Sequence, residues 1–285
     1  MRVNIVHIGS NDWFNFKSDI ISGLYSALVD LGLDVLISHN QIPTAGFNVV
    51  VGADWIQSRD LMALFQKSSG GFAIFEIEHL MNDTINGRAN FDFELYMDLA
   101  RSASFIFSPY RQNRTAYEKY GCGDKFVSFE WGFFPEIIDL RYAKARIKHF
   151  DCCFVGMAKG SRQKLIQSFS DRYGNRFQLV TTSDPFCMKD FKLMHSHWAL
   201  SLKDENDIVQ SVNPFRIFHH LANGLPVLAN HKDDPDDYSR FVVYQPSTSI
   251  VEFAKTSSAK PTQDLESLAR SSVLSENLRP IFGKL

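Results

Sequence analysis

Three cationic side chains stand where two expected helices begin. Lys159 and Arg162 follow Gly156, which ends the apolar run from Phe150 to Val155, and Arg216 lies in the apolar helix start Pro-Phe-Arg-Ile-Phe. Amide hydrogens at a helix N-terminus, together with fixed cations, hold a diphosphate and stabilise its leaving charge without a metal. The alternatives are a solvated helix start for Lys159 and Arg162, and a salt bridge for Arg216, because an apolar helix seldom carries an unpaired charge.

A second group of side chains could act as a general base, the group that accepts a proton from an attacking hydroxyl. Asp12 follows the first expected strand, and Glu76, Glu78 and His79 follow the fourth. Asp12 could instead cap the next helix. The polar loop 82–90 could contact a hydroxylated acceptor, although mobile loops share its composition.

Several common chemistries lack their motifs. The turns after the two opening strands contain no GxGxxG, and the chain has no GxxxxGK[ST], HExxH or GxSxG. Nicotinamide-dependent hydride transfer, P-loop chemistry, zinc proteolysis and serine hydrolysis are therefore not expected. The acidic run 233–237 is interpreted as a solvated loop rather than a cation site, so we predict no metal and no cofactor.

The elements that must position these residues alternate between strand and helix. Val3 to Ile8 is an apolar run that ends at Gly9, apolar residues then recur at helical spacing from Ile20 to Leu31, and a strand follows from Asp34. The same order restarts at residue 150. This alternation predicts parallel sheets with helices on both faces.

The predicted fold class is α/β, with two tandem Rossmann-like domains that face each other across a cleft. We place the domains at 1–145 and 146–285, where the basic stretch 131–149 interrupts the pattern and is interpreted as a solvated linker helix. Near the C-terminus, 265–274 is weakly amphipathic. Ligands of such sheets bind beyond the carboxyl ends of the strands.

Composition narrows the class of protein. The chain has 285 residues and a net charge of −2, which argues against a dedicated nucleic-acid binder. Its four cysteines form no CxxC, so neither a disulfide framework nor a zinc site is expected. No apolar run is long enough to span a membrane, and the N-terminus does not resemble a secretion signal. We therefore expect a cytoplasmic protein, with peripheral membrane contact left open.

Three segments in the second half resemble the C-terminal, nucleotide-sugar-binding domain of GT-B-fold glycosyltransferases, in particular the spore-protein-like and family 1-like branches. Residues 150–156 are similar to the strand that opens that domain, and 193–202 to a later strand. The third segment follows the pattern A-x-G-x-P-V, preceded by the opening NPFR; its matching residues are Asn213, Arg216, Ala222, Gly224, Pro226 and Val227. The first half is similar only in pattern, although 75–79 resembles an NxEQ segment of some members.

The resemblance implies a metal-independent glycosyltransferase of polysaccharide biosynthesis. The second domain would bind a nucleotide-diphosphate sugar as co-substrate through Gly156, Lys159, Arg162, Asn213, Arg216 and His219. The first domain would bind a glycan or lipid-linked acceptor, with Asp12, Glu78 or His79 as the base of an inverting reaction.

In one respect the sequence departs from the family pattern, and this limits which parts of the family's mechanism can be expected here. Retaining members often have two glutamates eight positions apart, and those positions are Ser211 and His219 here. A mechanism that depends on the pair is therefore not expected, and His219 could instead bond the donor sugar or phosphate. His220 would point to the other face. The alternatives to a transferase are a sugar-nucleotide epimerase or hydrolase of the same fold, and a non-catalytic homologue that binds glycan or protein.

Overall fold

The computed structural model describes most of the chain. The described residues are 2–12, 17–88, 91–138, 141–142, 147–156, 158, 162–181, 184–203, 212–231, 234, 236–256 and 263–283. The chain forms two compact units, the first made of Met1–Phe134 and Val273–Leu285 and the second of Pro135–Ser272. None of the helices in the described part of the chain is long and apolar enough to cross a membrane.

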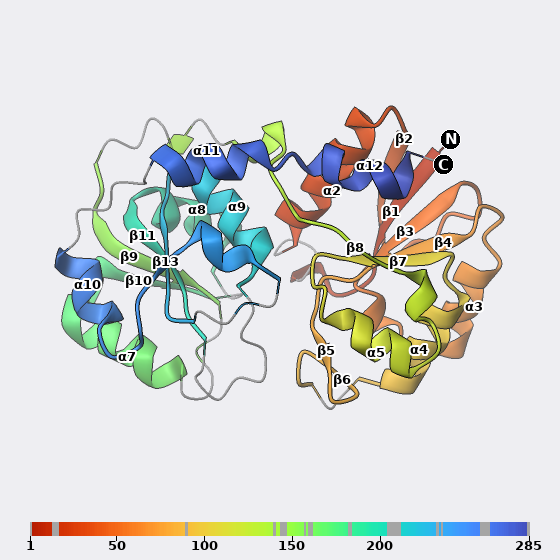
Figure 1. Cartoon of the computed structure of the whole chain (residues 1–285), viewed down its shortest axis with the longest axis horizontal. Coiled ribbons are helices and arrows are strands. Elements are labelled where there is room, and N and C mark those ends of the chain that lie inside the picture. Colours follow the sequence, from red (N-terminus) through yellow and green to blue (C-terminus); the bar gives the residue numbers. More distant parts are fainter. Residues whose placement is uncertain are drawn as a thin grey trace. The chain divides into compact units, whose positions relative to one another are not determined.

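The first unit is a parallel six-stranded sheet with helices on both faces (Figure 1). Its strands run in the order β2-β1-β3-β4-β7-β8. The strands are β1 (Arg2–His7), β2 (Asp34–His39), β3 (Phe47–Val51), β4 (Phe72–Phe75), β7 (Phe105–Ser108) and β8 (Phe126–Ser128). The helices are α2 (Ser18–Asp30), α3 (Arg59–Gln66), α4 (Phe93–Ser102), α5 (Asn113–Lys119) and α12 (Leu274–Phe282), and a hairpin of β5 (Leu80–Met81) and β6 (Thr84–Ile85) follows β4.

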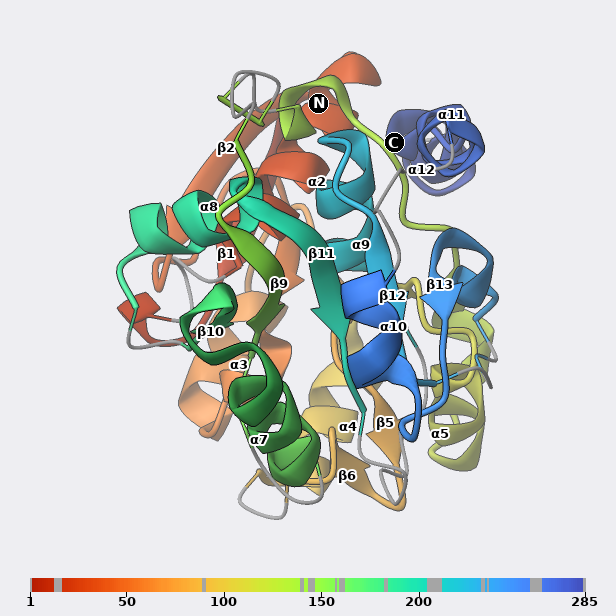
Figure 2. The ribbon, with the colours of Figure 1, turned by 90° about the vertical axis from the view of Figure 1, so that its left-hand side faces the viewer.

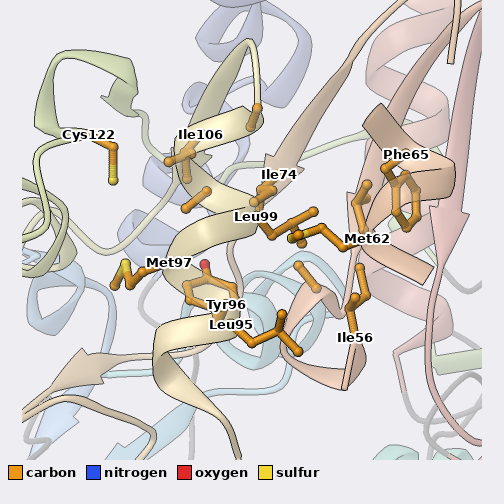
Figure 3. Packing of buried hydrophobic residues seen from close by; sticks show 14 of the residues in the cluster. Ile56, Met62, Phe65, Ile74, Leu95, Tyr96, Met97, Leu99, Ile106 and Cys122 are labelled. Atoms are coloured by element: carbon orange, nitrogen blue, oxygen red, sulfur yellow. The ribbon is translucent and has the colours of Figure 1, made fainter. Parts of the chain in front are cut away.

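The two faces of this sheet follow from the alternation of side chains along its strands. Ile74 and Ile106 point to the face covered by α3 and α4, where Figure 3 shows Leu95 and Leu99 of α4 directed toward the α3 side of the core. The opposite face is aromatic. Phe107 stacks on Phe75 at 4.8 Å between ring centroids, on the side covered by α12.

The second unit repeats the plan with five parallel strands in the order β10-β9-β11-β12-β13 (Figure 2). The strands are β9 (Phe150–Val155), β10 (Phe177–Val180), β11 (Ser196–Ser201), β12 (Val227–Ala229) and β13 (Val243–Tyr244). The helices are α7 (Arg162–Tyr173), α8 (Phe186–Met194), α9 (Pro214–Ala222), α10 (Ile250–Thr256) and α11 (Gln263–Ser271). Phe154 and Trp198 share a buried cluster with residues of α7 and α10, so these helices cover one face.

The division of the chain differs from the predicted boundary at 145/146 at two places. Residues 135–145 belong to the second unit, where the carbonyl of Ile137 accepts a hydrogen bond at 2.9 Å from the side chain of Asn223, which follows α9. Residues 273–285 belong to the first unit, because the Phe282 ring packs edge-on against Phe105 and Phe107.

Candidate active site

The glycine turn after β9 lies where the strand order of the second unit reverses, because β10 is on one side of β9 and β11 on the other. In open parallel sheets this reversal is the usual place for ligands. Gly156 has a φ of +149°, and a Cβ there would lie 3.2 Å from the Phe154 ring and 3.4 Å from Nη1 of Arg216. A residue with a side chain would be strained at this position and would crowd the Phe154 ring.

Arg216 reaches this turn from the first turn of α9. The side chain of Asn213 caps the helix by accepting a hydrogen bond from the Arg216 amide at 3.3 Å, and Pro214 fills the next position, which needs no amide hydrogen. Nη1 of Arg216 donates to the carbonyl oxygen of Val155 at 2.8 Å. The structure therefore brings Gly156, Asn213 and Arg216 together at the end of β9.

Arg162 supplies a second guanidinium at the neighbouring strand end. It begins α7, its Nη1 donates to the Leu202 carbonyl just after β11 at 3.4 Å, and its guanidinium lies 5.6 Å from the centroid of the Phe154 ring. Its Nε is buried and has no hydrogen-bond partner among the described residues. A neutral carbonyl does not cancel the charge of a guanidinium, so Arg162 brings a positive charge to this edge of the sheet. Lys159 lies outside the described residues.

His219 lies one turn after Arg216 on the same side of α9. It is half-buried, and its ring stands edge-on to Tyr142 at 6.1 Å. His220 is instead a buried core residue. Burial holds its pKa well below the usual value, and the positive charges of His219, Lys189 and Arg216 act in the same direction. His220 is therefore neutral at physiological pH.

In the first unit the corresponding strand ends carry a cluster of buried and half-buried charges. Glu78 lies 3.9 Å from Nζ of Lys17 and 3.9 Å from Nη2 of Arg88, and its Oε2 accepts a hydrogen bond from Asn86 at 3.1 Å. Arg88 also binds Asp54, which follows β3, at 2.9 Å. Glu78 is thus a carboxylate held between two cations at the carboxyl edge of the sheet.

His79, the next residue, is turned to other partners. It is buried, its Nδ1 lies 2.7 Å from Nε2 of the Gln112 side chain, and its ring packs on Tyr110. Asn113 fixes the peptide between the two, because its side chain accepts from the Leu80 amide at 2.9 Å and donates to the Glu78 carbonyl at 2.8 Å.

Glu76 is buried beneath this segment. Burial raises its pKa to about 8, with the negative charge of Asp54 acting in the same direction. Its carboxyl oxygens accept from the Tyr96 hydroxyl and, at 2.7 Å, from the Glu78 amide. Because Glu76 faces the core, it positions the segment of Glu78 rather than offering a base to a ligand.

Asp12 lies in an exposed helical turn before α2, and its side chain has no hydrogen bond or ion pair with another described residue. The N-cap of α2 is Lys17, so Asp12 does not cap that helix.

Sequence reasoning missed the other members of the unit-1 cluster. His7, at the end of β1, is buried, and its pKa is lowered to about 4 by burial first and then by the charges of Lys17 and His39. Asp54 follows the glycine that ends β3, so the strand-end rule that selected Asp12 and Glu78 would also have found it. Arg88 lies in the polar loop 82–90 that the sequence had already indicated, whereas for Lys17 the sequence offered no comparable signal. Across the described ranges, no three His, Cys, Asp or Glu side chains gather closely enough to hold a metal ion.

Comparison with known proteins gives similarity in structure only. No protein-family model and no curated protein matches the sequence. Among solved structures, the chain is similar to Anabaena HepE in complex with UDP and glucose, with a TM-score of 0.58, 10% identity, and coverage of 99% of this chain and 100% of HepE. It is also similar to an alpha-glucosyltransferase in complex with UDP and a 13-mer DNA, with a TM-score of 0.56, 10% identity, and coverage of 98% and 95%.

A third similar structure is AviGT4, a glycosyltransferase of avilamycin A biosynthesis, with a TM-score of 0.53, 12% identity, and coverage of 96% of this chain and 93% of AviGT4. These similarities extend over nearly the whole chain and confirm the predicted α/β class with two Rossmann-like domains. The chain therefore has the GT-B fold of these glycosyltransferases.

Proposed function

We propose that this protein is a glycosyltransferase that takes a sugar from a nucleotide-diphosphate donor. The observation that carries the proposal is the pair of guanidinium groups of Arg216 and Arg162, which are bonded to backbone carbonyls at the ends of the adjacent strands β9 and β11. A pyrophosphate needs fixed positive charge both for binding and for departure as a leaving group. UDP is the nucleotide present in two of the similar structures, HepE and the alpha-glucosyltransferase, and is our first choice of nucleotide.

The roles in the second unit follow from their positions. Arg216 and Arg162 bind the two phosphates, and the Gly156 turn gives the ligand access to the backbone. His219 bonds the donor sugar or phosphate, and Lys159 adds a third cation. Because two guanidiniums supply the charge that a divalent ion would otherwise provide, we propose that transfer is metal-independent.

The first unit binds the acceptor, for which a glycan or lipid-linked sugar remains our proposal. Glu78 is the preferred base, because the partners of His79 already engage its ring and Nδ1. In an inverting reaction Glu78 would accept the proton of the acceptor hydroxyl as that oxygen attacks the anomeric carbon and the nucleotide diphosphate leaves. Asp12 is the second candidate. We expect Glu78→Gln to lower kcat by about 10²- to 10⁴-fold and to leave the affinity for UDP unchanged.

Calorimetric titration with UDP tests the donor site. Arg216→Ala should weaken binding by about 1.5–3 kcal/mol, the range for a hydrogen bond to a charged group, which is roughly a 10- to 150-fold rise in Kd. Arg216→Lys should recover only part of the loss, because lysine lacks the planar fork of donors. The matched control is Arg172→Ala in α7, where the arginine is bonded to Glu252 instead. Equal affinity of the wild type and Arg216→Ala for UDP, GDP and ADP would exclude this role.

A further inference from the structure

The strand order of the first unit reverses at β1, and Trp55 covers the turns at that point. β1 has β2 on one side and β3 on the other, which makes the carboxyl ends of β1 and β3 the usual place for a ligand. Trp55 ends a short 3₁₀ helix, Ala53–Trp55, that follows β3. A Cβ on either Gly9 or Gly52 would lie 3.7 Å from Cδ1 of its indole ring, so the ring lies over both glycine turns.

The surroundings of this indole ring are held in place by several contacts. The ring is half-buried and stands edge-on to Phe91, with 5.6 Å between the ring centroids. The guanidinium of Arg88 lies 4.3 Å from the centroid of Phe91 and binds Asp54, the residue before Trp55, at 2.9 Å. Nε of Arg88 also donates to the Ile85 carbonyl at 3.2 Å. Three partners therefore fix Arg88 beside the aromatic pair.

Two partly exposed charges next to the ring can bond hydroxyl groups. The side chain of Arg88 is 26% exposed and that of Glu78 17%, and 3.9 Å separates Nη2 of Arg88 from Oε1 of Glu78. Nη1 of Arg88 has no hydrogen bond to any of the described residues, whereas Asp54 is buried and serves to position Arg88. A guanidinium donates and a carboxylate accepts, so this pair suits a hydroxyl group, which does both.

This combination selects among the ligands that an aromatic ring can bind. An acyl chain on Trp55 would cover Arg88 and Glu78 and separate their charges from water, which is costly. A nucleotide could stack on the indole, but Lys17 and Arg88 are matched by Glu78 and Asp54, so these four side chains have no net positive charge for its phosphate. A sugar ring fits both features, because its C–H hydrogens pack on the aromatic face and its hydroxyls reach the charged groups.

We propose that Trp55 is the platform for the terminal sugar of the acceptor, a neutral hexopyranose whose hydroxyls are bonded by Arg88 and Glu78. The proposal names the substrate class of the acceptor site and rests on the proposed function for the reaction that follows, although binding of the sugar itself needs no donor. The sugar that packs on Trp55 is then the one that presents its attacking hydroxyl to Glu78.

Fluorine NMR of the full chain labelled with 5-fluorotryptophan locates the contact. The chain has four tryptophans, and the resonance that is missing from Trp55→Phe belongs to Trp55. Methyl β-glucopyranoside should shift this resonance in a saturable way, and the resonances of Trp131 and Trp198, which are 1% and 3% exposed, should stay in place. Methyl β-galactopyranoside and methyl α-mannopyranoside are the other two probes. Glucose 6-phosphate should bind no more tightly than the glucoside, because the charges at the site are balanced.

Substitution of Trp55 distinguishes an aromatic platform from apolar filling. Trp55→Leu keeps an apolar side chain but removes the aromatic face, and it should raise the Kd of the glucoside, measured by saturation-transfer NMR, about three- to tenfold. Trp55→Phe should recover most of the affinity. Tyr25→Leu is the matched control, because Tyr25 is an aromatic residue of the same unit and is 39% exposed on α2. Thermal unfolding shows whether each variant keeps its fold.

Several results would overturn the proposal. They are a Trp55 resonance that none of the three glycosides shifts, a folded Trp55→Leu that binds the glucoside as tightly as the wild type, and clearly tighter binding of glucose 6-phosphate. A shift caused by uridine but by none of the glycosides would also overturn it, in favour of a nucleobase site. Titration with UDP distinguishes the two proposals: Trp55-dependent sugar binding without UDP binding refutes the donor site alone, and UDP binding without Trp55-dependent sugar binding refutes the platform alone.

Discussion

The buried carboxyl of Glu76 makes a quantitative prediction about stability and pH. Its pKa is raised to about 8 by burial and by Asp54, and the hydrogen bonds from Tyr96 and the Glu78 amide oppose this shift without cancelling it. In the unfolded chain a glutamate ionises near pH 4.5. Between these two values the folded protein binds one proton more than the unfolded protein at this position.

The sign of the effect follows from that difference. Stability falls as pH rises wherever the folded state binds more protons, at about 1.4 kcal/mol per pH unit for one proton. The fall begins near pH 4.5, ends near pH 8, and spans about 3.5 units, so the ceiling is roughly 5 kcal/mol. Relaxation around a buried carboxylate reduces this, and we expect a loss of about 2–4 kcal/mol.

Glu76→Gln isolates this contribution. The glutamine amide has the shape of the protonated acid, its oxygen can accept from the Glu78 amide, and its nitrogen can donate to the Tyr96 oxygen. Urea unfolding at several pH values should show the variant matching the wild type near pH 5 and exceeding it by about 2–4 kcal/mol near pH 8. Glu94→Gln, at an exposed position of α4, should leave the pH dependence as it is. A difference between Glu76→Gln and wild type that stays constant from pH 5 to pH 8 would refute the reasoning.

Three further changes test the packing and the donor turn. Phe282→Ala should destabilise the first unit by about 3–5 kcal/mol in urea unfolding, because the ring is buried edge-on against Phe107 at 5.2 Å; a loss below about 1 kcal/mol would contradict this packing. Gly70→Ala should cost about 1–3 kcal/mol in the same assay, because its Cβ would lie 2.1 Å from the carbonyl oxygen of Gly46, and an unchanged midpoint would argue against that close approach. Gly156→Ala should weaken UDP binding in calorimetry, and full affinity would show that the turn tolerates a side chain.

The fold could be predicted because its signals are local. Each strand is an apolar run of a few residues, glycine turns separate strands from helices, and the order strand-helix-strand implies a parallel sheet. The order of strand and helix also predicts that Gly156 and Arg216 lie at one edge of the second sheet. Gly156 follows the carboxyl end of a strand, and Arg216 lies at the start of a helix that begins at the same edge. In the structure, Nη1 of Arg216 donates a hydrogen bond of 2.8 Å to the carbonyl oxygen of Val155, the residue before Gly156.

The parts that sequence reasoning did not reach depend on distant partners. The sequence offers the neighbours Glu78 and His79 equally as candidate bases. In the structure their side chains have different partners, because the side chain of Asn113, far along the chain, holds the backbone between Glu78 and Leu80. The C-terminal helix is a second case. The weakly amphipathic stretch noted at 265–274 covers α11, and the sequence does not reveal that Phe282 of α12 completes the aromatic layer of the first sheet, since that layer is assembled from strands far away in the sequence.

The charges at the two strand edges differ in a way that bears on what each can bind. In the second unit Arg162 and Arg216 donate to backbone carbonyls at the ends of adjacent strands, so the two guanidinium groups are fixed in place, which favours an anionic ligand. Such preorganised donors need little rearrangement when a pyrophosphate arrives.

In the first unit the charges are balanced. Lys17 and Arg88 lie beside Glu78 and Asp54, while Glu76 is protonated and His7 is neutral at pH 7. Two cations and two anions suit an uncharged, hydroxyl-rich acceptor better than a second anion. Ionisation of Glu76 above about pH 8 would add a third negative charge beneath Glu78. The pH that destabilises this unit should therefore also make the surroundings of the proposed base more negative, and Glu76→Gln should remove both effects together.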